Sequence, residues 1–164
     1  MNLEQLAKDL FSDDRKHMEQ MIFASIFIHQ NKMQTACDKL DSEITMKQWL
    51  LLAVVSTFDT PMSLSQIGEI MGCSRQNVKK LANSLQKKGY IKYESDNRST
   101  FILVEDKMKE YIAKVGDMQE NVLKILFEDF SNEEIKQYFN LVTKLYSSIE
   151  KVENYAHEIK SERK

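Results

Sequence analysis

The chain has one proline and four glycines among its 164 residues, so few positions favour turns or irregular structure. This scarcity predicts long helices joined by short loops. No run of about 18 apolar residues is present, so no membrane-spanning helix is expected. The opening Met-Asn-Leu-Glu-Gln-Leu lacks the basic and apolar segments of a signal peptide, which favours a cytoplasmic protein.

Cysteine and histidine are also scarce. Cys37 and Cys73 lie far apart without CxxC spacing, which argues against a metal site or a disulfide scaffold. His17, His29 and His157 fall on separate predicted helices. No P-loop, GxGxxG, HExxH or nucleophile elbow is present, and no carboxylate pair has a credible partner. We therefore expect no enzymatic activity, no cofactor and no metal.

The formal net charge of −2 conceals an uneven distribution. Seven basic and two acidic residues lie between Arg75 and Arg98, so this segment carries +5 and the rest of the chain −7. A basic segment in an acidic protein indicates a local site for a polyanion, although a solvated helix face is the alternative. The basic residues are Arg75, Lys79, Lys80, Lys87, Lys88, Lys92 and Arg98.

The same region has the capping and turn residues expected of a helix-turn-helix. Ser63, followed three residues later by Gln66, predicts a capping box that opens a short helix. Gly72 is placed to end that helix, and Ser74 to cap a second one that Gly89 ends. Together they predict a short helix, a glycine turn and a second helix.

The second helix presents side chains suited to a DNA groove. Arg pairs with guanine, Asn or Gln with adenine, and Lys with phosphate, while the helix N-terminus attracts phosphate. Gly68 costs the first helix about 1 kcal/mol relative to alanine, which predicts close approach of the crossing second helix. The predicted DNA-binding residues of this helix are Ser74, Arg75, Gln76, Asn77, Lys79, Lys80 and Asn83.

A β-hairpin is predicted to follow. Residues 90–93 and 99–104 are rich in aromatic and β-branched side chains and flank a polar tip. Arg98 at the tip is placed to enter a narrow minor groove, with Asp96 orienting it. The alternative is an exposed ion pair that contributes well under about 1 kcal/mol.

The remaining chain is predicted to be helical. Residues 2–11 form a short amphipathic helix, and a longer helix capped by residues 12–14 extends to about Leu40. Its apolar residues between Met21 and Ile28 spread over more than one side, which suggests two packing partners. Further helices are expected over 44–58 and 106–128. In the 44–58 helix, packing is predicted from Thr45, Trp49, Leu50, Leu52 and Val54.

Ser131 and Glu134 predict another capping box, which opens a long C-terminal helix with two heptad lines. Four heptads favour a helical seam with a partner, and we expect a homodimer because so small a chain leaves this helix little to pack on. The two lines are Ile135, Val142, Ile149 and Ala156, and Tyr138, Leu145, Val152 and Ile159.

The order of these motifs resembles the MarR (multiple antibiotic resistance regulator) family of bacterial winged-helix transcription factors. The similarity is carried by Ile-Thr-Met-Lys-Gln-Trp at 44–49, residues 64–72, 74–85 and 88–91, and Asp96-x-Arg98. The hairpin tip is shorter than is usual in that family. Val104-Glu105-Asp106-Lys107-Met108 stands where the family commonly has Leu-Thr-Glu-Lys-Gly.

The resemblance implies a mainly α fold: a three-helix core with a β-hairpin wing, flanked by N- and C-terminal dimerisation helices. The implied division is 1–42 for N-terminal dimerisation helices, 43–105 for the DNA-binding domain and 106–164 for C-terminal dimerisation helices. The implied function is a homodimeric repressor on a double-stranded, pseudo-palindromic DNA operator, released by a small-molecule effector.

The family often senses small aromatic or lipophilic molecules between its dimerisation helices and its DNA-binding lobe. The alternative role for most residues of that crevice is ordinary core packing, and for His29 a structural hydrogen bond. Two other functions stay open: a winged-helix protein-interaction module, and a thiol-based sensor in which Cys73, just before the recognition helix, is oxidised. The implied effector residues are Ile22, Ile26, His29, Met33, Trp49 and Leu52.

Overall fold

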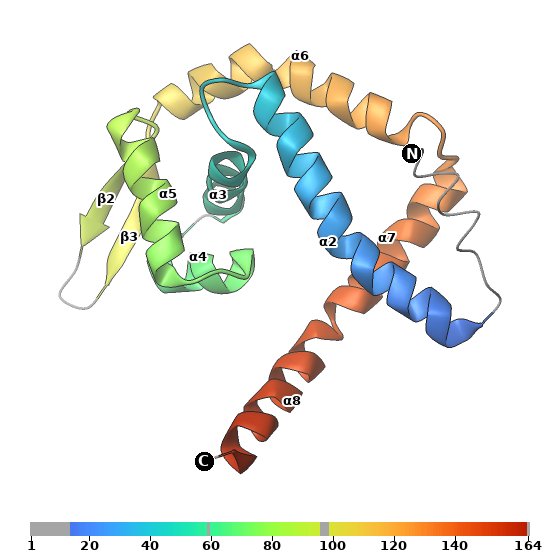
Figure 1. Ribbon diagram of the computed structural model, residues 1–164. Helices are drawn as coiled ribbons and strands as arrows, with labels where there is room; N and C mark the ends of the chain where they lie inside the picture. The colour runs from blue at the N-terminus through green and yellow to red at the C-terminus, as the bar shows by residue number, and fades with distance from the viewer. Residues whose placement is uncertain (1–13, 59, 96–98, 164) are drawn as a thin grey trace. The chain divides into compact units, whose positions relative to one another are not determined.

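The computed structural model describes residues 14–58, 60–95 and 99–163. It divides into two compact units between Tyr111 and Ile112. The predicted helix over 2–11 lies outside the described residues. The elements, shown in Figure 1, are α2 (Arg15–Leu40), α3 (Met46–Thr57), β1 (Met62–Ser63), α4 (Leu64–Met71), α5 (Arg75–Lys87), β2 (Ile91–Ser95), β3 (Thr100–Val104), α6 (Lys107–Phe127), α7 (Asn132–Tyr146) and α8 (Ile149–Glu162).

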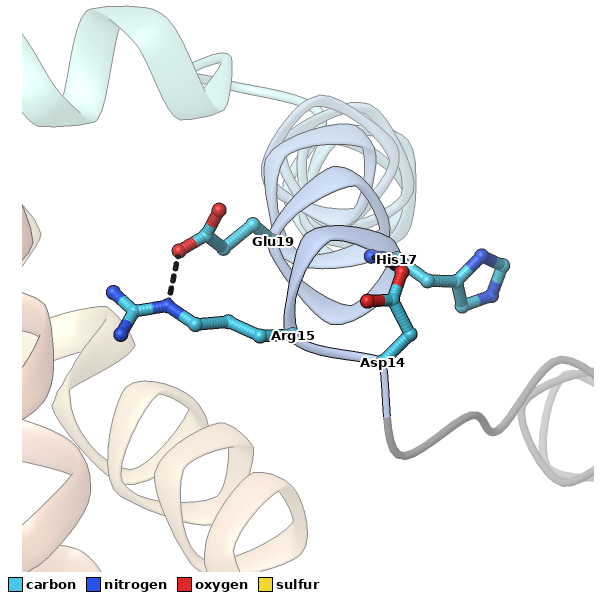
Figure 2. Close-up of polar contacts among 4 residues, drawn as sticks. All are labelled: Asp14, Arg15, His17 and Glu19. Carbon is cyan, nitrogen blue, oxygen red and sulfur yellow. Dashed lines mark hydrogen bonds and ion pairs between the residues drawn. The ribbon is translucent and has the colours of Figure 1, made fainter.

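Helix α2 begins at a side-chain cap. The carboxylate of Asp14 accepts a hydrogen bond of 3.0 Å from the N–H of His17, and Figure 2 shows this carboxylate beside the first turn. Arg15 Nε donates to Glu19 Oε1 at 2.8 Å in an exposed pair, which adds little stability. The large apolar residues between Met21 and Ile28 remain exposed in the single chain, so this face has room for a partner.

Helices α3, α4 and α5 contact one another and form the core of the first unit together with the sheet. Two packing predictions for α3 are wrong: Leu50 is 40% exposed whereas Leu51 is completely buried, and Thr45 caps the helix instead of packing. Three leucines in a row leave the inward position undecided by pattern alone. The fully buried large side chains are Tyr90, Leu51, Leu52, Ile67, Leu85, Ile91, Ile102 and Val78.

The predicted hairpin is present, and it is part of a three-stranded antiparallel sheet of order β1-β3-β2. In the ladder, Tyr93 on β2 pairs with Ile102 on β3, and Ile102 also pairs with Met62 on β1. Strand β3 therefore lies in the centre of the sheet and is hydrogen-bonded on both sides. The hairpin is thereby joined, at Phe101 and Ile102 of β3, to the strand that leads directly into α4.

In the second unit, the predicted capping box at the start of α7 is confirmed. Ser131 Oγ accepts from the Glu134 N–H at 3.3 Å, and the Glu134 carboxylate accepts from the Ser131 N–H at 2.8 Å. The Ser131 N–H bond keeps the pKa of Glu134 below its ordinary value. The start of this helix was therefore readable from two residues.

The prediction of one long C-terminal helix is wrong, because α7 and α8 are separated at Ser147 and Ser148. The two serine hydroxyls donate to the carbonyls of Thr143 and Lys144 at 3.0 and 3.2 Å. Such bonds compete with the helical ladder and bend helices. The residues of both predicted heptad lines are exposed or half-buried in the single chain.

Candidate nucleic-acid interface

The helix-turn-helix is built by the predicted local signals. The side chain of Ser63 accepts from the Gln66 N–H, and Gln66 Oε1 accepts from the Ser63 N–H at 2.9 Å. Gly72 ends α4 with φ 62°, in the left-handed region that favours glycine. Ser74 then caps α5 by accepting from the Asn77 N–H at 3.2 Å. These contacts fix where α5 begins.

Gly68 is required by a close backbone approach. A Cβ at this position would lie 2.7 Å from the carbonyl oxygen of Cys73 and 3.5 Å from the nitrogen of Arg75. The predicted close approach is therefore found, although the nearest atom belongs to the turn and not to the crossing helix. The Cys73 N–H also donates to the Gly68 carbonyl at 2.9 Å, so the turn rests directly on α4.

The polar face of α5 lines a concave surface of about 450 Å³. Four side chains predicted to bind DNA lie there together, and Ser84 and Lys87 join them without having been predicted as contacts. Arg75 and Asn77 are also exposed on α5, whereas Asp96 and Arg98 lie outside the described residues. The lining residues are Gln76, Lys79, Lys80, Asn83, Ser84 and Lys87.

Two lysines of the basic segment do not face this surface. Lys88 Nζ donates to the Glu43 carbonyl, and Lys92 Nζ pairs with a Glu105 carboxylate oxygen at 2.9 Å. The hydrogen bond to Glu105 raises the pKa of Lys92. The charge count therefore overstated the cationic face, which α5 itself supplies through Arg75 and three lysines.

A residue of the hairpin reaches the same face of α5. The hydroxyl of Tyr93, on β2, donates to Asn83 Oδ1 at 2.8 Å and lies 3.5 Å from the Lys79 carbonyl oxygen. Burial raises the pKa of Tyr93, so its hydroxyl keeps its proton at neutral pH. The sequence marked Tyr93 only as a strand aromatic, and no local pattern indicated its contact with a helix.

Gln48 connects α3 to α5. Its side chain is buried, donates to Ser84 Oγ at 2.8 Å and accepts from the Thr45 N–H at 3.1 Å. Lys88 Nζ lies 3.5 Å from the same amide oxygen. The buried amide thus has both a donor contact and an acceptor contact, and its bond to Ser84 joins α3 to α5.

A second polar cluster joins the segment that precedes α3 to Tyr90 and to the first turns of α6. Tyr90 donates to the Glu43 carboxylate and Tyr111 to the Asp41 carboxylate. The two rings meet edge to face at 5.5 Å between centroids, and Lys107 Nζ lies 4.9 Å from the centre of the Tyr90 ring. Burial, followed by the carboxylate bond, raises the pKa of both tyrosines above the ordinary 10.0.

The predicted effector residues differ in accessibility. Ile22, Ile26 and His29 are exposed on α2, Met33 and Trp49 are half-buried, and Leu52 is completely buried in the core. Helices α2 and α3, which carry them, are in contact. The effector pocket stays a prediction.

Cys73 is half-buried at the turn before α5 and is not in a disulfide. Among the described residues, no group of three or more His, Cys, Asp or Glu side chains is placed to hold a metal ion. In the same part of the chain, no helix combines the length and apolar character needed to cross a membrane.

Comparisons with known proteins agree with this geometry. Residues 42–99 match the model of the MarR family. The transcriptional repressor MprA of Escherichia coli K12 is 25% identical over 142 residues, 82% of this chain and 81% of the repressor. A MarR/EmrR family transcriptional regulator from Acinetobacter sp. ADP1 has the same fold, with a TM-score of 0.73, 24% identity and coverage of 82% of this chain and 98% of that one.

The S. aureus MepR–DNA complex contains the fold as well. Its protein matches with a TM-score of 0.68 and 18% identity over 77% of this chain and 97% of that one. The family match covers the helix-turn-helix and the first strand of the hairpin, and the structural match extends over most of the chain. Residues 42–99 thus match the MarR family, and the chain as a whole is similar in sequence to the repressor MprA and in fold to the MarR/EmrR family regulator.

Proposed function

We propose that this protein is a homodimeric transcriptional repressor that binds a pseudo-palindromic DNA operator through α5 and is released by a small-molecule effector. The observation that carries the proposal is the exposed face of α5, where amides and lysines lie side by side on a concave surface. The relative MprA, a transcriptional repressor, supports repression, and the MepR–DNA complex supports DNA as the ligand.

Different parts of α5 have different tasks in this proposal. Arg75, Gln76 and Asn77 lie in the first turn, where recognition helices contact base edges. Lys79 and Lys80 are exposed one turn further on and suit phosphate oxygens. Arg98, with Asp96 two residues before it in sequence, remains our candidate for a minor-groove contact.

A second copy of the chain provides the second recognition helix. Exposed apolar side chains on α2 and along α7 and α8 offer surface for such an interface, including Phe23, Phe27, Leu145 and Val152. Two recognition helices about 34 Å apart reach successive major grooves on one side of DNA. We place the dimerisation helices at 1–42 and 106–164 and the DNA-binding domain at 43–105.

The effector in this proposal is a small aromatic or lipophilic molecule bound near Ile22, Ile26, His29, Met33 and Trp49, with Leu52 behind them. A shift of α2 against α3 on binding would change the separation of the two recognition helices. The protein acts in the cytoplasm, where the operator is, and carries out no catalysis.

The testing experiment is selection of genomic DNA fragments by the purified full-length protein, followed by titration of the selected duplex at several salt concentrations. Each phosphate contact makes the slope of log K against log salt more negative by about 0.9. Lys79→Ala should therefore make the slope less steep by about that amount. Lys160→Ala, on the exposed face of α8, should leave the slope unchanged. Equal binding of selected and random DNA would contradict the proposal, and salt-independent binding would favour a protein-interaction module.

A further inference from the structure

The hydroxyl of Tyr93 determines which atoms of Asn83 face outward. Asn83 is exposed on α5 and lines the concave surface, while Tyr93 is half-buried and anchored in the sheet through its pairing with Ile102. Their 2.8 Å bond joins the hairpin to the recognition helix at a point where DNA is proposed to bind. A hydrogen bond at this position affects which groups of Asn83 are presented to a ligand, as well as the stability of the fold.

The geometry defines the donor and the acceptor. The Tyr93 hydroxyl has one proton and two acceptors within reach, Asn83 Oδ1 at 2.8 Å and the Lys79 carbonyl at 3.5 Å. The shorter distance is typical of an O–H···O bond and the longer one is at the outer limit. The amide oxygen of Asn83 therefore points toward Tyr93 with one of its two lone pairs engaged, and the NH₂ group on the other side of the amide is the part turned away from the hairpin.

An asparagine that presents both its oxygen and its NH₂ group can bind adenine through N6 and N7. With the oxygen turned toward Tyr93, this bidentate contact is lost and the NH₂ group is the one that reaches a base edge, where it suits acceptors: guanine O6 and N7 or thymine O4. Lys79, Lys80 and Lys87 on the same surface are also donors only. Donors therefore predominate on this surface, although Gln76 and Ser84 also carry acceptor oxygens.

We propose that Tyr93 is a positioning residue for DNA specificity: it holds Asn83 as a donor, so that the protein prefers an acceptor-bearing base edge at the position Asn83 contacts. The inference rests on the proposed DNA-binding function. It also gives the hairpin a role in base selection through its first strand, separate from that of the tip.

The experiment is selection from a randomised duplex library by the full-length wild type and four variants. Asn83→Ala identifies the base pair that residue 83 reads, because preference disappears there. Tyr93→Phe removes the hydroxyl and keeps the ring, so the Asn83 amide becomes free to bind adenine through both its oxygen and its NH₂ group. The preference for an acceptor-bearing base edge at that pair should then weaken at least about threefold. Tyr155→Phe, in exposed α8, removes a hydroxyl elsewhere and should leave the preference unchanged.

Asn83→Asp gives the sharper contrast. An aspartate still accepts from Tyr93 but presents an oxygen where the NH₂ group was, so the preference should move to a donor-bearing edge, cytosine N4 or adenine N6. A merely structural role for Tyr93 would lower affinity for all sequences equally and leave every preference in place.

The results separate the two proposals. If the wild type selects no sequence, the DNA-binding function fails and this inference fails with it. If the wild type selects a sequence but Asn83→Ala or Tyr93→Phe leaves all base preferences unchanged, only the positioning role is overturned. An Asn83→Asp variant with wild-type preference would likewise refute the donor-only orientation.

Discussion

Replacing Gly68 with alanine sets two effects of opposite sign against each other. Alanine in a helix interior is favoured over glycine by about 1 kcal/mol. The new Cβ, however, would lie 2.7 Å from the Cys73 carbonyl oxygen, which is backbone and cannot rotate away. The turn that holds this oxygen is fixed on one side by Gly72 at φ 62° and on the other by the Ser74 cap.

Overpacking of this kind costs about 1–3 kcal/mol, and more where the backbone must move. Because the atom that clashes is backbone, the upper part of that range applies, about 2–3 kcal/mol. Less the gain of about 1 kcal/mol in helix propensity, Gly68→Ala should lower the free energy of unfolding by about 1–2 kcal/mol. Urea unfolding followed by circular dichroism, at one fixed protein concentration, measures this difference. Fixed concentration matters because the proposed dimerisation would contribute to the apparent stability.

Gly116→Ala is the matched control, since Gly116 lies within α6 and its Cβ would meet no atom within 4 Å. This variant should gain about 1 kcal/mol from helix propensity. A Gly68→Ala protein as stable as the wild type would refute the reasoning, because it would mean that the turn yields at little cost. Equal effects of the two substitutions would refute it as well.

Three further outcomes follow from the polar contacts. Gln48→Ala should lower the free energy of unfolding in urea by about 1–3 kcal/mol, because Ser84 and Thr45 lose their buried partner; no change would mean that water replaces the amide. Glu134 has a lowered pKa, so its contribution to stability is complete above about 4.5 and is lost as the pH falls; Glu134→Gln should remove this acid dependence of thermal unfolding. Tyr111 has a raised pKa, so its contribution is complete below 10.0 and lost at higher pH; Tyr111→Phe should flatten the alkaline decline, and an unchanged slope would contradict the assignment.

The elements that the sequence predicted well are those controlled by neighbouring residues. Ser63, Gly72, Ser74 and Ser131 each act within a few positions along the chain, and each takes the predicted role. The hairpin strands were predicted for the same reason, since aromatic and β-branched content is a local property. The helix-turn-helix could therefore be placed without any knowledge of packing.

The features that were missed depend on contacts between distant residues. Strand β1 has only two residues, too few for an alternating pattern, and exists because β3 lies beside it. Lys88 and Tyr93 could not be assigned partners because Glu43 and Asn83 come from other elements. The break at Ser147 was readable in principle, because paired serines within a helix compete for its carbonyls.

The bond between Asp41 and Tyr111 makes the intervening chain a closed unit. This segment, residues 41–111, begins directly after α2 and ends in the first turns of α6, and the hydrogen bond brings its two ends together. Domains whose ends are close tolerate insertion into other chains and rearrangement of their termini. Residues 41–111 are therefore expected to keep their fold when the helices before and after them are replaced.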